Sequence, residues 1–276
     1  MKYFMNHLQI NSIADRLIAA YDHVQTLEPI TESQPKFSVT DAYSVLHEIN
    51  RRREVGGWKR VGRKIGFTNR TIWPRYGVDR PNVAPMYSHT VHRASDGHAE
   101  IALNKFVQPR IEPEVVFGLR GAVPVNGSAR DVLDAVEWMA AGFEIVQCHF
   151  PDWKFAVPDC TASFGLHAYL IVGRVVLLDN RARDRLATVL PTFEVTLYRG
   201  SEIVARGRGS NVLDSPALAL RYLAQVVASQ PQSPPLTAGE IITTGTLTDA
   251  QPIAPGACWC SDYGELGVGG LELHLK

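Results

Sequence analysis

Apolar side chains in the N-terminal part of the chain recur at the spacing of helices. Ser12, with Asp15 three residues later, forms a helix-start signal before one apolar stripe. Ser38 and Asp41 repeat that signal before a second stripe, whose members recur at i, i+3, i+4 and i+7. We therefore expect residues 1–57 to form a helical arm.

Residues 58–276 show a different pattern, in which short apolar segments of strand length alternate with Gly and Pro. The expected strands span residues 111–119, 143–148, 166–172, 193–198, 203–206, 241–244 and 271–275. Two helices interrupt them: one begins near Ser128 and buries side chains as far as Met139, and the other is capped by Ser215 and ends near residue 227. The pattern predicts an α+β fold in which a β-rich domain follows the arm, with one continuous domain as the alternative.

Composition narrows the class of partner. Lys plus Arg and Asp plus Glu both number 28 among 276 residues, and the pI is about 7.1. This balance argues against nucleic acid or an anionic membrane as the main partner. The first ten residues lack the apolar core of a signal peptide, and no apolar run is long enough to span a bilayer. We therefore expect a soluble, cytoplasmic protein.

The four cysteines do not form a familiar framework. Cys258 and Cys260 are spaced as C-x-C, whereas C-x-x-C is the pair that suggests zinc or redox chemistry. Cys148 and Cys160 stand alone in the sequence. So few cysteines favour a reducing compartment over a disulfide scaffold.

Glu112 and Glu114 are the sharpest local feature with chemical meaning. They begin an apolar strand, and side chains at i and i+2 of a strand point to the same face. Two adjacent carboxylates repel each other unless they are solvated or bridged by a cation. Hard cations such as Mg²⁺ and Mn²⁺ take oxygen ligands, so this spacing indicates a metal pair. A solvated strand end is the alternative.

Two further residues are candidates for chemistry. Lys64 belongs to a basic pair that leads into a Gly-containing turn, where it could hold a carboxylate or transfer a proton. An ordinary exposed lysine is the alternative. His149 could approach a metal from the end of a strand, although lone histidines are more often structural.

Seven segments, taken in order along the chain, resemble one family. They are Ala42-Tyr43, Gly62-Arg63-Lys64-Ile65-Gly66-Phe67-Thr68, Gly77-Val78-Asp79-Arg80-Pro81, Pro109-Arg110-Ile111-Glu112-Pro113-Glu114, Phe143-Glu144-Ile145-Val146, Asn211-Val212-Leu213-Asp214-Ser215-Pro216, and Ala238-Gly239-Glu240 with Thr243-Thr244-Gly245-Thr246. Together they are similar to the fumarylacetoacetate-hydrolase superfamily, in particular to its branch of 2-keto-4-pentenoate hydratases and 4-oxalocrotonate decarboxylases.

The resemblance implies a β-rich mixed-sheet roll, a homo-oligomer, and Mg²⁺ or Mn²⁺ bound by Glu112 and Glu114. In the family an Asp three residues after the equivalent of Glu144 is the third ligand, and Gln147 occupies that position here. An amide oxygen can ligate a hard cation but carries no charge, so we expect weaker metal binding. If Gln147 faces away, His149, Asp152 or water must complete the coordination.

The resemblance also implies a reaction. In the family the metal chelates the C1 carboxylate and C2 oxygen of a small 2-oxo or 2-hydroxy-dienoic acid, which makes the 2-oxo group an electron sink. A hydratase protonates the far end of a 2-hydroxy-2,4-dienoate and adds water, giving a 4-hydroxy-2-oxo acid in aromatic catabolism. Lys64 and Asp79 match positions suited to proton transfer or positioning. Asp159, Ser163 and Thr246 match polar segments near the substrate.

Three other functions stay open at this stage. A decarboxylase of the 4-oxalocrotonate type uses the same chelate to receive electrons as carbon dioxide leaves. A C–C hydrolase ranks lower because no histidine–glutamate pair is clearly placed in an N-terminal loop. The departure at Gln147 also allows an inactive binding paralogue. The far end of the substrate pocket is expected to use aromatic side chains, namely Trp73, Tyr76, Phe150, Trp153 and Phe155.

Overall fold

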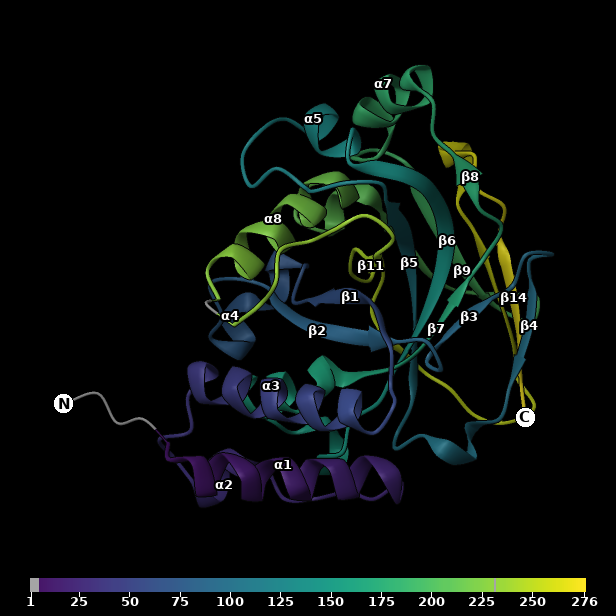
Figure 1. The fold of residues 1–276 in the computed structure, drawn as a ribbon. Helices are drawn as coiled ribbons and strands as arrows, with labels where there is room; N and C mark the ends of the chain where they lie inside the picture. Colours follow the sequence, from purple (N-terminus) through teal and green to yellow (C-terminus); the bar gives the residue numbers. More distant parts are fainter. Residues whose placement is uncertain (1–4, 231) are drawn as a thin grey trace.

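The computed structural model describes residues 5–230 and 232–276. Its helices lie around two sheets (Figure 1). The helices are α1 (His7–Asp22), α2 (Ile30–Ser33), α3 (Val39–Val55), α4 (Trp73–Tyr76), α5 (Ala129–Leu133), α6 (Val157–Ala162), α7 (Asn180–Val189) and α8 (Pro216–Ala228). Within the described part of the chain, no helix has the length and apolar character needed to cross a membrane.

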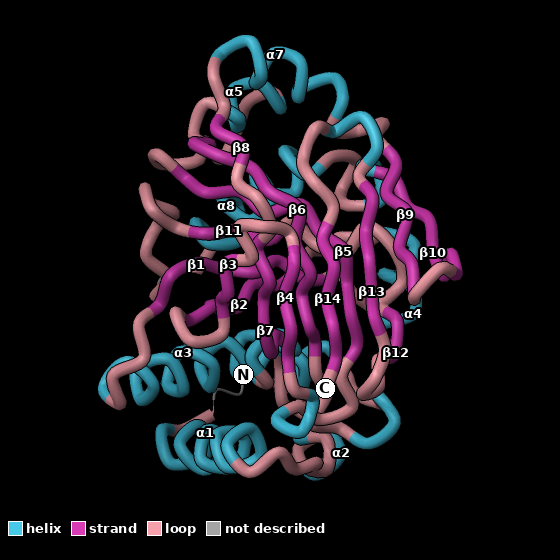
Figure 2. Tube along the Cα trace, turned by 90° about the vertical axis from the view of Figure 1, so that its right-hand side faces the viewer, coloured by secondary structure: helices cyan, strands magenta, loops and turns pink. Residues whose placement is uncertain are grey.

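Two sheets form the centre of the molecule. The strands are β1 (Arg60–Gly66), β2 (Asn82–Tyr87), β3 (Val91–Arg93), β4 (His98–Ile101), β5 (Arg110–Leu119), β6 (Val136–Val146), β7 (His167–Val172), β8 (Val176–Leu177), β9 (Glu194–Arg199), β10 (Glu202–Arg208), β11 (Ile241–Thr243), β12 (Gln251–Pro252), β13 (Cys258–Asp262) and β14 (Leu271–Leu275). The larger, mixed sheet has the order β2-β1-β11-β5-β6-β7-β3, and β12 and β8 pair with β5 and β6. The smaller sheet has the order β10-β9-β13-β14-β4, and Figure 2 shows its strands side by side. The expected β-rich mixed-sheet fold is confirmed.

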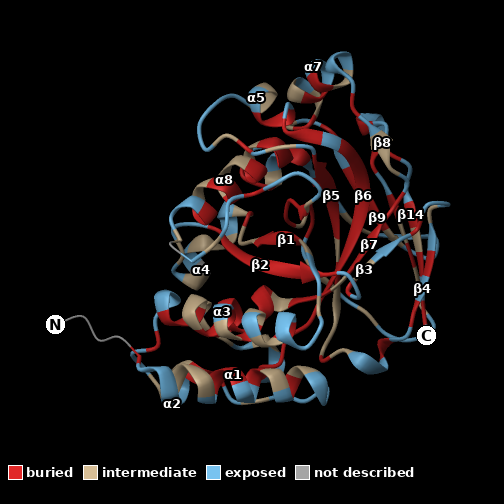
Figure 3. Cartoon of the chain, viewed as in Figure 1, coloured by how far each residue is buried: buried red, intermediate tan, exposed pale blue. Residues whose placement is uncertain are grey.

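The long strands β5 and β6 are buried on both faces, as their colouring in Figure 3 shows. Their odd-numbered residues, such as Phe117 and Phe143, belong to the main apolar core together with Trp259 and Leu271 of the smaller sheet. Their even-numbered residues point to the opposite face because successive side chains of a strand alternate. That even-numbered face carries a smaller apolar cluster around Val116, and it also carries the candidate site.

The two long helices of the N-terminal arm, α1 and α3, begin at capping boxes. The expected start of α3 is confirmed, since Ser38 Oγ accepts from the Asp41 backbone N–H and the Asp41 carboxylate accepts from the backbone N–H of Ser38. The expected start of α1 at Ser12 is wrong: Asn6 and Gln9 form its capping box. Whether residues 1–57 form a separate domain stays a prediction.

The arm is held against the rest of the chain by one apolar cluster. Ile13 and Leu17 of α1 and Ile49 of α3 share this cluster with Phe150 and Phe164, which follow β6. Each of these five side chains is at most 3% exposed. Full burial of a large apolar side chain stabilises a fold by about 1.5–3 kcal/mol, so this cluster fixes the arm beside the segment that leads to the site.

The helix expected from Ser128 to Met139 is only partly correct. Ser128 and Asp131 form a capping box, but the helix α5 ends at Leu133. Val136 and Met139 belong to β6, where they pair with Leu119 and Phe117 of β5. The helix-start signal is local, and the backbone pairing with β5 determines the conformation a few residues later.

The capping box of α3 gives a stability prediction. Replacing Ser38 by Ala leaves the Asp41 backbone N–H without its acceptor, so we expect the free energy of unfolding to fall by about 1 kcal/mol. Ser44→Ala, on the exposed side of the same helix, removes a hydroxyl that only bonds back to Thr40 and should change stability much less. Urea unfolding of both variants measures the difference, and equal values would contradict the capping role.

Candidate metal centre and active-site cavity

Three glutamates meet on the even-numbered face of β5 and β6. The antiparallel register sets Glu112 directly opposite Glu144, and Glu114 follows two residues along β5 on the same face. One carboxylate oxygen of each lies within 4.8 Å of the other two. Glu114 and Glu144 are fully buried. The cluster therefore lies inside the protein, and the alternative of a solvated strand end does not hold.

Gln147, expected as the third ligand, faces away from this cluster. It lies just beyond the end of β6, and its Oε1 accepts a hydrogen bond of 3.1 Å from the backbone N–H of Val107. The Gln147 side-chain oxygen is therefore taken up by the backbone near β5 and not directed at the glutamates. Glu144 stands in the carboxylate group instead, and it carries the negative charge that Gln147 lacks.

Lys64 is the cation that reaches the glutamates. From β1 its Nζ lies 3.6 Å from Glu144 Oε1 and donates a hydrogen bond of 3.1 Å to the backbone carbonyl of Gly165. His167 of β7 lies on the other side, with Nδ1 2.8 Å from the same Glu144 oxygen. Lys64 is 5% exposed, so it is a buried partner of the cluster and not an ordinary surface lysine.

Burial and mutual repulsion give the three carboxyl groups different pKa values. Burial, reinforced by the neighbouring carboxylates, raises the pKa of Glu112 to about 7 and raises the pKa of Glu114 well above its usual value. Burial also acts on Glu144, but Lys64 and the hydrogen bond from His167 hold its pKa below the usual value. Burial lowers the pKa of Lys64, but the three carboxylates outweigh it and raise that pKa overall. The lysine therefore stays charged.

Backbone conformation fixes the surroundings of the cluster. The Gly245 N–H donates to Glu114 Oε2 at 2.8 Å. Gly245 has φ +99°, and a Cβ there would lie 1.9 Å from Thr68 Oγ1, so a larger residue would be both strained and in collision. The carbonyl that holds Lys64 belongs to a turn in which Phe164, Gly165 and Leu166 all have positive φ. Such left-handed residues persist only where the surrounding packing imposes them.

A cavity of about 170 Å³ opens beside Glu112 and Glu114. This volume is below the range of about 300–1,000 Å³ found for drug-sized ligands, so it suits a small acid. Lys64, Asn82 and Thr246 contribute polar groups to its wall. Its apolar lining includes Ile65, Phe67, Ile72, Tyr76, Val146, Trp153, Phe155 and Leu166. Of the five expected aromatic residues, Tyr76, Trp153 and Phe155 line it, whereas Phe150 and Trp73 pack in the apolar clusters.

The other expected site residues lie elsewhere. The side chain of Asp79 is 80% exposed and pairs with Arg80, and it does not line the cavity that contains Lys64. Asp159 accepts hydrogen bonds from the backbone N–H groups of Thr31 and Ala156, which joins α2 to the start of α6. Asp79 and Asp159 therefore lie outside the cavity that contains Lys64.

Ser163 and His149 pair with each other. Ser163 Oγ lies 3.1 Å from His149 Nδ1, both side chains are buried, and neither lines the cavity beside the glutamates. Burial lowers the pKa of His149 to about 4, so its ring is neutral at pH 7. A structural role therefore describes both residues better than contact with a metal or substrate. Thr246 alone, of the three residues expected to bind substrate, lines this cavity.

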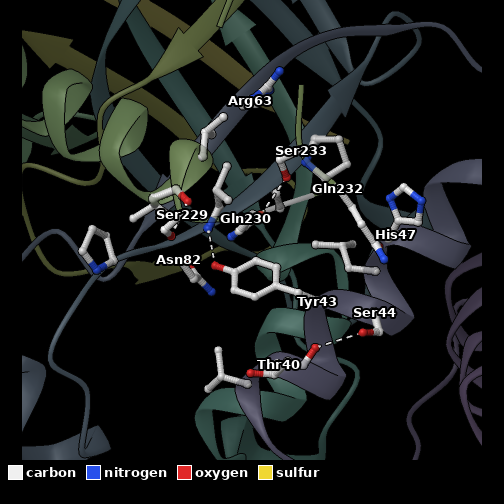
Figure 4. A pocket seen from close by; sticks show the side chains of 18 of the residues that line it. Thr40, Tyr43, Ser44, His47, Arg63, Asn82, Ser229, Gln230, Gln232 and Ser233 are labelled. Atoms are coloured by element: carbon white, nitrogen blue, oxygen red, sulfur yellow. Dashed lines mark hydrogen bonds between the residues drawn. The ribbon is translucent and has the colours of Figure 1, made fainter. Parts of the chain in front are cut away.

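A larger cavity of about 990 Å³ lies between α3, β2 and the loop after α8. Figure 4 shows Tyr43 directed into it from α3, with Gln230 and Ser233 on the loop side. Among the described residues, no group of three potential metal-ligating side chains gathers in this cavity. The two cavities share Tyr76 and Asn82 in their walls. We therefore assign the chemistry to the smaller cavity.

The donor set of the smaller cavity suits a hard divalent cation. With all three carboxyls ionised, the three carboxylates and the one ammonium would leave two negative charges in a buried space for a divalent cation to neutralise. Glu114 Oε1 and Glu144 Oε2 are buried and have no hydrogen-bond partner. Carboxylate oxygens with free lone pairs are the ligands that Mg²⁺ and Mn²⁺ prefer. The residues present therefore fit the expected metal.

Glu144 and His167 were not predicted from the sequence as site residues. The segment around Glu144 was matched to the strand that brings the third ligand, but a fixed offset pointed to Gln147. Strand alternation and the cross-strand position opposite Glu112 were the signals that could have identified Glu144. His167 gives no such signal, because its contact with Glu144 depends on the pairing of β6 with β7.

Metal titration tests whether Glu144, and not Gln147, acts as the third metal ligand. Glu144→Gln removes a charged oxygen from the cluster, so we expect the affinity for Mg²⁺ or Mn²⁺ to fall by at least about tenfold. Gln147→Asp should not tighten binding, since the side chain at 147 faces Val107. Tighter binding in Gln147→Asp, with Glu144→Gln unaffected, would return the third position to residue 147.

Metal affinity should also depend on pH with a definite sign. Glu112 and Glu114 have raised pKa values in the metal-free protein, so at low pH they hold protons that the metal must displace. We expect affinity to rise as pH increases through about 7. Calorimetry in buffers of different ionisation enthalpy measures the protons released. Affinity that stays flat between pH 5.5 and 8, without proton release, would contradict this account.

A family model and several known proteins match the chain. The Fumarylacetoacetate (FAA) hydrolase C-terminal family model matches residues 66–266. The chain is 30% identical over 249 residues to a 2-hydroxyhexa-2,4-dienoate hydratase of Comamonas testosteroni, with 90% of each chain covered. It is 30% identical over 258 residues to a 4-oxalocrotonate decarboxylase of a Pseudomonas species, covering 88% of this chain and 90% of the relative.

A solved structure extends the similarity to almost every residue. The 4-oxalocrotonate decarboxylase from Pseudomonas putida G7, complexed with magnesium and adipate, has a TM-score of 0.89 to this structure at 25% identity, with 99% of each chain covered. This structural similarity and the family-model match over residues 66–266 support the same family. The chain belongs to the fumarylacetoacetate-hydrolase family.

Proposed function

We propose that the protein is a metal-dependent hydratase, which adds water to a 2-hydroxy-2,4-dienoate to give a 4-hydroxy-2-oxo acid. The observation that carries the proposal is the buried glutamate cluster, which lies with Lys64 at the wall of a small cavity with largely apolar surroundings. The similarity to a relative named 2-hydroxyhexa-2,4-dienoate hydratase supports this substrate class.

Glu112, Glu114 and Glu144 would hold Mg²⁺ or Mn²⁺. When bound, such a cation supplies a Lewis acid that stabilises negative charge on the 2-oxo group of the substrate. The three carboxylates fix its place because each is held by the sheet, and the Gly245 N–H orients Glu114 further. A site on paired strands keeps its geometry better than one on loops.

Lys64 would bind the substrate and donate a proton to it. Its Nζ has one strong acceptor, the Gly165 carbonyl, and lies 3.6 Å from Glu144. An ammonium has three donors, so one N–H is left for a substrate oxygen or carbon in the cavity. Because the neighbouring carboxylates keep this group charged, it can stabilise negative charge near them or donate a proton to the dienoate.

Asn82 is a suitable group to orient the water. It lines the cavity, its Nδ2 donates to Thr161 Oγ1 at 3.3 Å, and its buried Oδ1 has no hydrogen-bond partner. A free amide oxygen in a wet cavity can accept a hydrogen bond from a water molecule. Phe67, Tyr76 and Phe155 surround the rest of the space and would contact the hydrocarbon end of the substrate.

Decarboxylation of a 2-oxo diacid is the second candidate. Arg110 lines the cavity and stacks on Trp153, with its guanidinium carbon 4.0 Å from the ring centroid. A second carboxylate on the substrate could pair with this cation. The relative of known structure is named as a 4-oxalocrotonate decarboxylase, which supports this alternative.

A direct comparison of substrates tests the two candidates. The full-length protein is given 2-hydroxypenta-2,4-dienoate and 4-oxalocrotonate in turn, with Mg²⁺ or Mn²⁺, and products are identified by mass. We expect the dienoate to be consumed faster and its product to be heavier by one water. Preferential release of carbon dioxide from the diacid, with loss of that activity in Arg110→Met, would favour the decarboxylase instead.

The role of Lys64 gives a mutational prediction. Lys64→Met keeps most of the side-chain length and removes the charge, so we expect turnover to fall by roughly 10²–10⁴-fold, the usual contribution of a positioned acid or base. Part of any loss could come from the metal site, so metal affinity is measured on the same variant. Turnover within a factor of about two of wild type would remove Lys64 from the mechanism.

A further inference from the structure

The outer face of the smaller sheet carries a second group of metal-ligating side chains. Cys258 and Cys260 of β13 lie opposite His274 and Glu272 of β14, respectively, so that all four project to the same side. The intervening residues Trp259, Leu271, Leu273 and Leu275 are buried in the main core. Figure 2 shows β13 and β14 side by side in this sheet. The alternation therefore directs the thiols, the imidazole and the carboxylate outwards.

The side-chain atoms are already close together. One ligand atom each of Cys258, Cys260 and Glu272 lies within 4.8 Å of the other two. Cys258 Sγ is 3.9 Å from His274 Nε2, and Cys260 Sγ is 3.9 Å from Glu272 Oε2. The second oxygen of Glu272 lies 2.7 Å from His274 Nε2 and 3.6 Å from Nδ1 of His98 on β4. Both thiols are free.

The two separations of 3.9 Å are close to those of ligands around one tetrahedral ion, whereas the 2.7 Å between Glu272 and His274 is a hydrogen-bond distance that would lengthen on binding. Zinc binds thiolate sulfur at about 2.3 Å and imidazole nitrogen at about 2.0–2.1 Å, so two such ligands lie about 3.5–3.8 Å apart. We propose that Cys258, Cys260, Glu272 and His274 form a binding site for one thiophilic divalent cation, of which Zn²⁺ is the best fit. The sheet register already fixes the four Cα positions, and His274, which stands outside the group of three whose ligand atoms all lie within 4.8 Å, would turn toward Cys260 to complete the site.

The chemistry of this site separates it from the glutamate cluster. Two thiolates and an imidazole select a borderline-soft ion such as Zn²⁺, whereas three carboxylates select Mg²⁺ or Mn²⁺. Coordination converts the two thiols to thiolates and releases their protons to solvent. The two sites also lie in different sheets, since the glutamates belong to β5 and β6. Each site can therefore be filled while the other keeps its own ion.

The location indicates what the ion would do. Cys258 and Cys260 stand on one strand, and Glu272 and His274 stand on its neighbour, so one ion would crosslink β13 to β14. His98 on β4 contacts Glu272, which extends the connection to the edge strand of the sheet. A ligand that binds only the folded state stabilises it by mass action. The bound ion would therefore have a structural role, in which it stabilises the pairing of β13 with β14 in the smaller sheet.

Cobalt absorption provides a test that the carboxylate site cannot imitate. Full-length, reduced protein is saturated with Mg²⁺ and titrated with Co²⁺, followed by Zn²⁺. We expect a thiolate-to-cobalt charge-transfer band in the near ultraviolet and visible bands typical of tetrahedral Co²⁺, saturating at one ion per chain and lost when Zn²⁺ replaces it. The melting temperature should rise with Zn²⁺.

Matched variants assign the band to these residues. Cys258→Ser and Cys260→Ser should each weaken Co²⁺ and Zn²⁺ binding by more than the roughly 10–100-fold that loss of an outer-shell partner costs, and should leave hydratase turnover unchanged. His274→Gln should weaken binding while the thiolate band persists at high Co²⁺. Glu112→Gln, which alters the carboxylate cluster, should retain the full band.

Three results would overturn the proposal. The first is an absence of thiolate absorption at one equivalent of Co²⁺ in reduced wild-type protein. The second is a band of unchanged affinity in both cysteine variants, which would assign it to Cys148 or Cys160. The third is loss of the band in Glu112→Gln. Because the ligands are partly or well exposed, the serine and glutamine variants should fold, and circular dichroism checks this directly.

Discussion

The burial of three carboxylates beside one lysine is the interaction on which the rest of the structure depends. Removing a carboxylate from water costs several kcal/mol even after relaxation, and a buried like-charged pair adds repulsion. Lys64, His167 and the Gly245 N–H offset part of that cost at Glu144 and Glu114. The remainder leaves two carboxyls with raised pKa values, so a divalent cation that binds there must displace their protons and would then offset the repulsion between the carboxylates.

The surrounding fold can be understood as support for that cluster. The odd-numbered face of β5 and β6 is locked in the main core, so the even-numbered face cannot turn or slip without exposing large apolar side chains. Gly142, opposite Glu114, has no side chain, and a Cβ there would lie 2.4 Å from Val116. The left-handed turn at Phe164–Leu166 brings the carbonyl of Gly165 to the lysine. The packing of the core therefore keeps the carboxylates buried and holds the left-handed turn in place.

Strand pairing assembles, by the same geometry, the two groups of potential metal ligands found in the described part of the chain. On β5 and β6 it assembles three carboxylates on a buried face, and on β13 and β14 it assembles two thiols, an imidazole and a carboxylate on an exposed one. The difference in ligand type and burial would suit each group to a different ion and a different role. A hard, buried site suits Lewis-acid chemistry on a small acid, and a soft, exposed site suits structural crosslinking.

The sequence by itself determined the family, the β-rich fold and the elements with strong local signals. The capping box at Ser38 and the cap of α8 at Ser215 were identified correctly because their hydrogen bonds involve residues only a few positions apart. Glu112 and Glu114 were recognised as a same-face pair for the same reason, since strand alternation is local.

The tertiary structure decided which residues from distant segments meet. Glu144 replaced Gln147 because the register of β5 with β6 sets the partner of Glu112, and no linear offset contains that register. Asp79 was matched to an active-site motif, yet it lies on the surface beside Arg80. The C-x-C pair gave no metal signal in the sequence, because its partners His274 and Glu272 come from the next strand. Cross-strand contacts depend on global packing, which local patterns do not encode.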